Sequence, residues 1–216
     1  MASILWRPPG RLYFLTMDEA PVDPIQQVEA ACDAGIRWIQ LRMKLAPDEE
    51  VLEVARAAKK ICMERDCVLI INDRVAVAAE SGADGVHLGK QDMSTAEARR
   101  LLGEGRIIGG TANTIEDIRE HWRQGADYIG LGPCRYTTTK KNLSPILGLA
   151  GYQRILGQMR REQIPLPVVA IGGIGMEDVA PLLDAGLHGI AFSGMLVRAE
   201  DRPGLVRLLD ETIKNY

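Results

Sequence analysis

The chain has 216 residues, of which 46% are hydrophobic, so it can bury one large core, and chains of this size commonly fold as a single domain. Its formal net charge is -3, and acidic and basic residues are mixed along the chain. This pattern lacks the basic stripe of a nucleic-acid-binding protein. No segment approaches the roughly 20 apolar residues of a membrane span, so we expect neither nucleic acid nor a membrane as partner.

The cysteines and the N-terminus indicate the compartment. Cys32, Cys62, Cys67 and Cys134 show neither the spacing of metal ligands nor that of a disulfide framework, which is typical of a reducing compartment. The apolar run that begins at Ile4 is too short for a signal peptide. We therefore expect a soluble, cytoplasmic protein. The sequence leaves open whether it forms a homo-oligomer.

A weak internal repeat occurs four times along the chain. Gly35, Gly82, Gly125 and Gly186 each lie about three residues before an apolar run. Each glycine stands where a helix would end in the left-handed conformation, which glycine adopts without strain. The repeated unit is therefore a helix, a tight turn and a parallel strand.

Eight short apolar runs alternate with helical runs, and each has the composition of a buried strand. The clearest helix spans Asp48–Arg65, whose apolar residues recur at helical spacing. Eight alternating units without a break in composition predict one domain over residues 1–216, folded as a single (β/α)8 TIM barrel. A doubly wound open sheet is the alternative. The predicted strands are Arg11–Thr16, Trp38–Leu41, Val68–Ile71, Gly85–Leu88, Arg106–Gly109, Tyr128–Leu131, Val168–Ile171 and Gly189–Phe192.

Two acidic residues follow neighbouring strands of the predicted barrel. Asp73 comes just after the third strand and Asp92 just after the fourth, with a helix over Val75–Ser81 between them. Parallel strands end at the same edge of a sheet, so both acids should emerge there together. Mg²⁺ takes one or two carboxylates from a protein and its other ligands from water or phosphate oxygens. The pair predicts a Mg²⁺ site, although Asp73 alone could cap a helix and Asp92 alone could be a solvated loop acid.

Cations gather at the end of the second predicted strand. Alternation places Gln40, Arg42 and Lys44 on one side of the chain, so we expect two cations at the mouth of the barrel, where active sites are built in this fold. An ordinary surface charge pair is the alternative. Asn72 joins this edge from the third strand.

Polar residues also follow the fifth and sixth predicted strands. Thr111 and Asn113 come after the fifth strand, where a hydroxyl and an amide could equally cap the next helix. The longest irregular connection, residues 132–147, follows the sixth strand, and such loops are usually functional or mobile. Its candidate anion ligands are Thr137, Thr139 and Lys140.

Glycine-rich turns follow the last two predicted strands. Gly172 and Gly173 follow the seventh strand, and Ser193 and Gly194 follow the eighth. Turns at these two places commonly bind a phosphate through backbone N–H groups. They predict a site for a phosphomonoester.

A second anion site is expected where the cations meet the metal. It combines Arg42, Lys44 and Lys140 with a metal ion between Asp73 and Asp92. This positive charge exceeds what one phosphomonoester needs and suits a metal-bound pyrophosphate.

No protein nucleophile is apparent in the sequence. None of the cysteines lies at a predicted strand end beside a histidine, and no Ser-His-Asp order is present. His87 is the candidate base, but we favour its interpretation as a hydrogen-bonded histidine inside the barrel. A reaction in which pyrophosphate leaves and a phosphate-bearing acceptor attacks would suit these residues.

The residues at the predicted strand ends form motifs that occur together in one known family. These motifs are Gln40-Leu41-Arg42-x-Lys44, Ile71-Asn72-Asp73-Arg74, residues 82–89 with Gln91-Asp92, Gly130-x-Gly132-Pro133 with Thr137-x-Thr139-Lys140, and Ala170-Ile171-Gly172-Gly173-Ile174. Together they closely resemble the thiamine phosphate synthase family. The resemblance runs from the second to the eighth predicted strand, with the motifs in the order of the family.

The resemblance implies a transferase that joins hydroxymethylpyrimidine diphosphate to a thiazole phosphate and releases thiamine phosphate and pyrophosphate. It implies Mg²⁺ as the cofactor, held by Asp73 and Asp92, and a dissociative mechanism in which the thiazole nitrogen captures a cation stabilised by the aminopyrimidine. It further implies that Arg42, Asn72 and Lys140 contact the pyrophosphate, that Gln40 lies near the pyrimidine, and that Thr137, Thr139, Gly173 and Ser193 hold the thiazole phosphate.

The chain departs from the family pattern in two places. Arg135 and Tyr136 replace an aromatic-Pro pair before the first loop threonine. Thr111 and Asn113 replace the usual Ser and His, and a threonine keeps the hydroxyl donor.

Two rival functions use the same barrel. A thiazole tautomerase needs groups for proton transfer but no metal-bound pyrophosphate, so Lys140 and the pair Asp73 and Asp92 argue against it. A non-catalytic, phosphate-binding regulator would tolerate loss of the cations, whereas this chain retains them.

Overall fold

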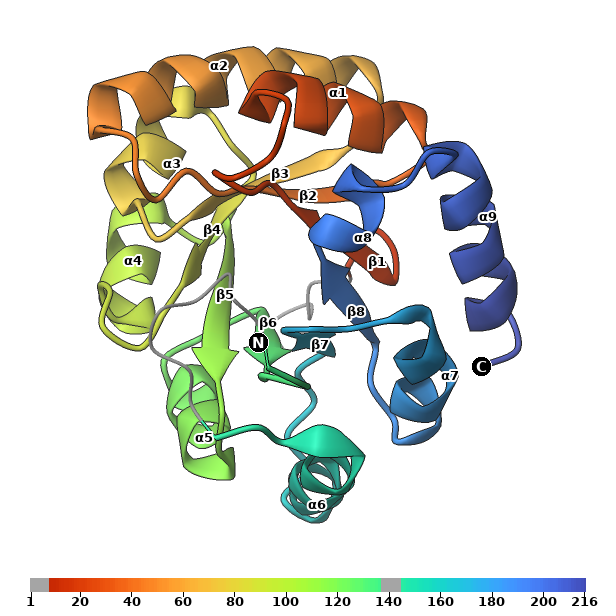
Figure 1. Ribbon diagram of the computed structural model, residues 1–216. Helices are drawn as coiled ribbons and strands as arrows, with labels where there is room; N and C mark the ends of the chain where they lie inside the picture. Colours follow the sequence, from red (N-terminus) through yellow and green to blue (C-terminus); the bar gives the residue numbers. More distant parts are fainter. Residues whose placement is uncertain (1–7, 137–144) are drawn as a thin grey trace.

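The computed structural model describes residues 8–136 and 145–216, and its strands form one closed parallel barrel (Figure 1). Neighbours in the barrel follow the order of the chain, and β1 pairs with β8 to close it. The predicted TIM barrel is confirmed and the open sheet is excluded. The strands are β1 (Leu12–Leu15), β2 (Trp38–Leu41), β3 (Val68–Asn72), β4 (Gly85–Leu88), β5 (Ile107–Ala112), β6 (Tyr128–Leu131), β7 (Val168–Ile171) and β8 (Gly189–Phe192).

The helices surround the barrel (Figure 1), and none within the described ranges is long and apolar enough to cross a membrane. The predicted helix over Val75–Ser81 is found with these bounds. The helices are α1 (Pro24–Asp33), α2 (Asp48–Glu64), α3 (Val75–Ser81), α4 (Thr95–Leu102), α5 (Ile115–Arg123), α6 (Gly148–Arg161), α7 (Met176–Asp184), α8 (Gly194–Val197) and α9 (Arg202–Ile213).

The strands are apolar on both faces because each face is buried. Outward side chains such as Ile39 and Leu69 pack under the helices in the larger core. Inward side chains, among them Tyr13, Trp38 and Tyr128, fill the inside of the barrel. Burying each large apolar side chain contributes roughly 1.5–3 kcal/mol.

The repeated glycines adopt the predicted left-handed conformation. Gly35, Gly82, Gly125 and Gly186 have φ angles of 106°, 74°, 83° and 102°. Each ends a helix and turns the chain into the next strand. The predicted unit of helix, tight turn and strand is confirmed.

The fifth strand is longer than predicted, since it continues beyond Gly109 to Ala112. Gly109 and Gly110 pair with Tyr128 and Ile129 of β6, so the two glycines belong to the sheet. A Cβ on Gly109 would collide with the ring of Tyr128. These glycines therefore mark a close approach between neighbouring side chains and backbone, not the end of the strand. As a result, Thr111 lies within the strand.

Candidate active site

The carboxyl ends of β2, β3 and β4 form the part of the rim that carries both predicted metal ligands. Asn72 is the last residue of β3 and pairs with His87 of β4. Asp73 follows directly, and its N–H group donates to the carbonyl of His87 at 2.8 Å. The pairing of β3 with β4 therefore fixes the position of Asp73 at the mouth of the barrel.

Asp73 has an unusual backbone conformation. Its φ angle is 64°, which few residues other than glycine adopt, and the Arg74 N–H group donates to the Asn72 carbonyl at 2.8 Å. A three-residue turn of this kind is strained, and strain of roughly 1–3 kcal/mol is found mainly at functional sites. The N-cap of α3 is Arg74, without a side-chain hydrogen bond, so Asp73 does not cap this helix.

The carboxyl groups of Asp73 and Asp92 lie close enough to share a hydrogen bond. Burial raises the pKa of Asp92, and the neighbouring Asp73 carboxylate raises it further. Burial also acts to raise the pKa of Asp73, but the hydrogen bond from Asp92 and the charge of Lys44 outweigh it, so this pKa is lowered. A carboxylate pair in which one pKa rises and the other falls is typical of two acids in one site.

Local backbone contacts hold Asp92 in place. Its Oδ2 atom accepts a hydrogen bond from the Gly89 N–H group at 2.6 Å. A Cβ at position 89 would lie 2.8 Å from the same oxygen, so glycine leaves room for this approach. Within the part of the chain that the structure describes, no group of three or more His, Cys, Asp or Glu residues could hold a metal ion. A metal between Asp73 and Asp92 would therefore take further ligands from water or substrate.

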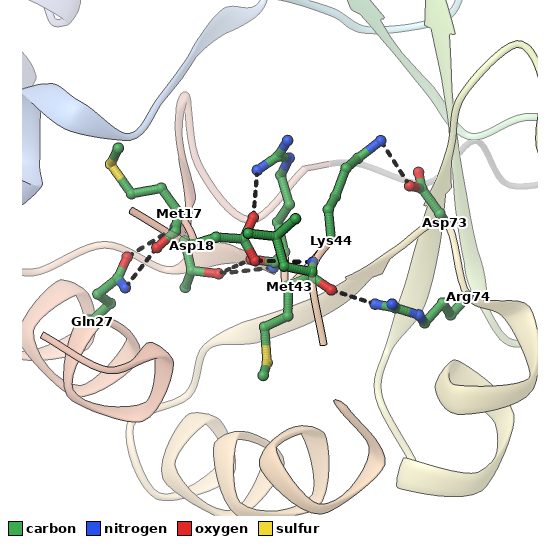
Figure 2. Close-up of polar contacts among 10 residues, drawn as sticks. Met17, Asp18, Gln27, Met43, Lys44, Asp73 and Arg74 are labelled. Carbon is green, nitrogen blue, oxygen red and sulfur yellow. Dashed lines mark hydrogen bonds and ion pairs between the residues drawn. The ribbon is translucent and has the colours of Figure 1, made fainter. Parts of the chain in front are cut away.

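Arg42 and Lys44 lie on the same rim but turn toward different carboxylates. The Lys44 ammonium is 3.1 Å from Asp73 Oδ2 (Figure 2), whereas the Arg42 guanidinium is 3.2 Å from Asp18 Oδ2. Arg42 is buried, and Thr16 Oγ1 accepts from its N–H group and donates to its carbonyl. The two cations on this rim are thus each paired with a carboxylate.

Asp18 is a site residue that the sequence reasoning missed. It follows β1 by three positions and accepts hydrogen bonds from the side chain of Arg42 and, at 3.5 Å, from the Leu45 N–H group. An acid just beyond a strand end was the signal that identified Asp73 and Asp92. The same signal was present here.

A chain of hydrogen bonds crosses the inside of the barrel below the rim. The Gln40 amide donates to the Tyr13 hydroxyl at 2.7 Å, and this hydroxyl lies 2.8 Å from that of Tyr128. His87 lies 3.0 Å from the Tyr128 hydroxyl through Nδ1 and 3.0 Å from Thr111 Oγ1 through Nε2. His87 is therefore a hydrogen-bonded histidine inside the barrel, as expected. Burial raises the pKa values of both tyrosines, which keeps these hydroxyls neutral.

Asn113 joins the end of β5 to the connection that follows β6. Its N–H group donates to Asp117 Oδ2 at 2.8 Å, and its side-chain amide donates to the Gly132 carbonyl. Lys90, from the connection after β4, pairs with Asp117 at 2.6 Å. Asn113 therefore bonds the segment after β5 to the segment after β6, a contact that the sequence did not indicate.

The two described ends of the long connection after β6 meet at the rim. Leu147 donates to the Pro133 carbonyl at 2.9 Å, and Gly148 donates to that of Cys134 at 3.3 Å. The first residues also extend the sheet, since the Cys134 N–H group donates to the carbonyl of Ile171 in β7 at 2.9 Å. Three predicted ligands lie outside the described residues, namely Thr137, Thr139 and Lys140.

The glycine turn after β7 packs against the connection that follows β6, which the sequence did not reveal. Gly172 and Gly173 have φ angles of 90° and 70°. A Cβ at Gly173 would lie 2.8 Å from the Tyr136 carbonyl oxygen and 3.0 Å from the Arg135 Cβ. The space beside this glycine is therefore needed by the connection after β6, in addition to any phosphate.

The turn after β8 lies next to this glycine turn. β7 and β8 are paired, with Ile171 opposite Ala191, so their ends are neighbours. Ser193 precedes α8 and Gly194 is its first residue. Both predicted phosphate-binding turns are thus brought together at one part of the rim.

The chain is similar to proteins of known activity along nearly its whole length. Residues 12–196 match the family model for thiamine monophosphate synthase. The thiamine-phosphate synthase of Bacteroides thetaiotaomicron is 54% identical over 190 residues, which cover 88% of this chain and 91% of the relative. That of Bacteroides fragilis is 50% identical over 190 residues, with coverage of 88% and 93%.

A solved structure is similar in both sequence and fold. The thiamine phosphate pyrophosphorylase from Pyrococcus furiosus superposes with a TM-score of 0.82 at 31% identity, and the match covers 95% of this chain and 96% of the other. The family model, the curated relatives and the barrel agree with one another. The chain therefore belongs to the thiamine monophosphate synthase family and is a transferase of thiamine biosynthesis.

Proposed function

We propose that the protein transfers the hydroxymethylpyrimidine group from its diphosphate to the nitrogen of thiazole phosphate, which yields thiamine phosphate and pyrophosphate. The observation that carries this proposal is the arrangement of the rim. The carboxylates of Asp73 and Asp92 lie together beside Lys44, and the paired strands β7 and β8 end in the glycine turns. A diphosphate and a phosphomonoester would each have a site of suitable charge.

Asp73 and Asp92 suit Mg²⁺ because they offer hard oxygen ligands from two directions. Besides burial, the neighbouring Asp73 carboxylate raises the pKa of Asp92, and a cation bound between the two groups would relieve this repulsion. Bound Mg²⁺ would stabilise negative charge on the diphosphate oxygens. The chain's own cations, Arg42 and Lys44, would bind the same group, with Asn72 beside them.

Lys140 completes the proposed pyrophosphate site, on the basis of the sequence motif. In a dissociative reaction, negative charge grows on the departing pyrophosphate as the carbon–oxygen bond breaks. A fixed cation therefore stabilises the transition state more than the bound substrate. The thiazole nitrogen has a free lone pair and needs no base, which agrees with the place of His87 inside the barrel.

The thiazole phosphate would bind at the other side of the rim. Gly172, Gly173 and Gly194 provide backbone close to this space, and Ser193 provides a hydroxyl. Thr137 and Thr139 are proposed to join from the connection after β6. Gln40 would face the pyrimidine, with its amide orientation set by the hydrogen bond to Tyr13.

We place this activity in the cytoplasm. The four cysteines of the chain are free and buried, as expected for a protein from a reducing compartment.

A turnover assay tests the proposal directly. The purified protein is mixed with both substrates and Mg²⁺, and thiamine phosphate and pyrophosphate are measured together. We expect the two products in equal amounts, and no reaction when EDTA replaces Mg²⁺. Isomerisation of a thiazole carboxylate without pyrophosphate release would indicate a tautomerase. Phosphate binding without turnover would indicate a regulator.

A further inference from the structure

Arg74 holds the connection between β2 and α2 from within the rim. Its Nη1 atom donates to the Met43 carbonyl at 2.5 Å and its Nη2 atom to the Ala46 carbonyl at 2.6 Å. Its Nε atom lies 2.7 Å from Asp48 Oδ1, at the start of α2. The Arg74 side chain is only 20% exposed. One guanidinium therefore bonds to two carbonyls of this connection and to the first residue of α2.

The two carbonyls that Arg74 holds lie on either side of Lys44 in the sequence. Lys44 itself is 45% exposed and reaches Asp73 at 3.1 Å (Figure 2). Its long side chain has no other ion pair among the described residues. The position of the ammonium group therefore depends on the backbone from which it extends, and Arg74 fixes that backbone on both sides.

Arg74 also belongs to the turn that presents the carboxylate. It directly follows Asp73, and its own N–H group donates to the Asn72 carbonyl at 2.8 Å. Its main chain thus closes the strained turn at Asp73, while its side chain crosses to the neighbouring connection (Figure 2). Lys44 and Asp73 are consequently held by the same residue.

We propose that Arg74 is a positioning residue that sets the Lys44 ammonium group relative to Asp73 and the diphosphate. The inference rests on the proposed function, because it assigns Lys44 to the pyrophosphate. A preorganised charge stabilises a developing anion only when its position is fixed before the reaction. Lysine could not replace Arg74, since an ammonium lacks the planar fork that reaches two carbonyls and a carboxylate at once.

The first test compares Arg74→Lys with a matched variant, Arg99→Lys. Arg99 makes the same kinds of contact at the opposite end of the barrel, to the carbonyls of Gly103 and Arg106 and to Asp127 at 3.0, 2.5 and 2.7 Å. Arg74→Lys should lower kcat/KM for the pyrimidine diphosphate by roughly 10–100-fold, the range for residues that orient a ligand-binding group. The KM for thiazole phosphate should stay unchanged. Arg99→Lys should lower only the melting temperature.

The second test is a double-mutant cycle with Lys44→Ala. If Arg74 acts through Lys44, Arg74→Lys should have almost no further effect on kcat/KM once Lys44 is removed. Losses that multiply in the double variant would overturn the inference, as would an equal kinetic loss in Arg99→Lys. Turnover by the unmodified enzyme separates the two proposals. If the unmodified enzyme does not turn over, the proposed function is wrong. If it turns over normally and Arg74→Lys has the same kcat/KM, only the positioning role of Arg74 is rejected.

Discussion

Asp73 combines three properties that point to its side chain. It is partly buried, it has a φ angle of 64°, and its carboxylate is close to both Asp92 and Lys44. A strained backbone costs stability, so a purely structural residue at this position would be better replaced by glycine. The strained turn thus agrees with the proposed role of the Asp73 side chain as a metal ligand.

Replacing either carboxylate tests the metal site. Asp73→Asn and Asp92→Asn should each remove most turnover and raise the Mg²⁺ concentration needed for half-maximal rate, because one anionic ligand is lost. Asparagine tolerates the left-handed region well, so Asp73→Asn should keep the turn. Steady-state kinetics over a Mg²⁺ titration measure the effect, and circular dichroism checks the fold.

A control variant removes a carboxylate away from the rim. Asp33 is 64% exposed and pairs with Arg65, so Asp33→Asn should leave both turnover and the Mg²⁺ requirement unchanged. Full activity in EDTA, or in both site variants, would contradict the assignment of Asp73 and Asp92 as metal ligands.

At the scale of elements, the turn between β7 and α7 links two parts of the proposed site. The Arg135 N–H group donates to the Gly172 carbonyl at 2.9 Å, and the Arg135 side chain pairs with Asp178 of α7 at 2.6 Å. Asp178 also accepts from the Gly175 N–H group at 2.9 Å. The glycine turn and the start of the connection after β6 therefore form one bonded unit.

Gly173→Ala tests this link. The new methyl group would meet the Tyr136 carbonyl oxygen at 2.8 Å, and alanine at a φ angle of 70° costs about 1–2 kcal/mol. We expect weaker binding of thiazole phosphate and, because the connection after β6 must shift, a lower kcat as well. Kinetics with each substrate varied in turn measure both effects.

Gly82→Ala is the matched control for the backbone cost. Gly82 has a φ angle of 74°, but nothing lies within 4 Å of a Cβ built there. This variant should lose similar stability from the left-handed conformation and keep both kinetic constants. If Gly173→Ala weakened thiazole phosphate binding alone, the glycine turn would act independently of the connection after β6.

At the scale of the whole molecule, the barrel is closed by contacts between the N-terminal and C-terminal parts of the chain. β1 pairs with β8, and Arg11 beside β1 donates to the carbonyls of His188 at 2.6 Å and Ile213 at 3.2 Å. The His188 ring in turn donates to the Gly10 carbonyl at 3.1 Å. Burial lowers the pKa of His188, and the charge of Arg11 also lowers it, although the hydrogen bond to Gly10 acts in the opposite direction.

The lowered pKa of His188 predicts a loss of stability in acid. The unfolded chain binds a proton near the ordinary histidine pKa of about 6.5, before the folded protein does. The stability that the neutral His188 side chain contributes to the folded protein is therefore fully present above about pH 6.5. It is lost as the pH falls toward the lower pKa of the folded protein. Urea unfolding between pH 7.5 and pH 5.5 should show a fall in unfolding free energy that is smaller in His188→Gln. An equal fall in both proteins would contradict this role.

Most of the fold could be predicted from local patterns in the sequence. Apolar runs of strand length and left-handed glycines depend on a residue and its near neighbours, so Gly35, Gly82, Gly125 and Gly186 were placed correctly. The same reasoning failed at β5, because Gly109 reflects the ring of Tyr128 on the next strand. Tyr128 is nineteen residues from Gly109 along the chain, and the two residues come into contact only when the barrel forms.

The sequence alone determined the barrel and the rim positions of Asp73, Asp92, Arg42 and Lys44, because strand ends and alternation place residues without reference to their partners. The family followed from the resemblance of the sequence motifs. Only the tertiary structure decided which groups meet. Arg42 turns to Asp18, Gln40 to Tyr13 and Arg74 to the backbone around Lys44. Each of these contacts joins different strands or connections. It forms only because the closed barrel brings the two groups within hydrogen-bonding distance of each other.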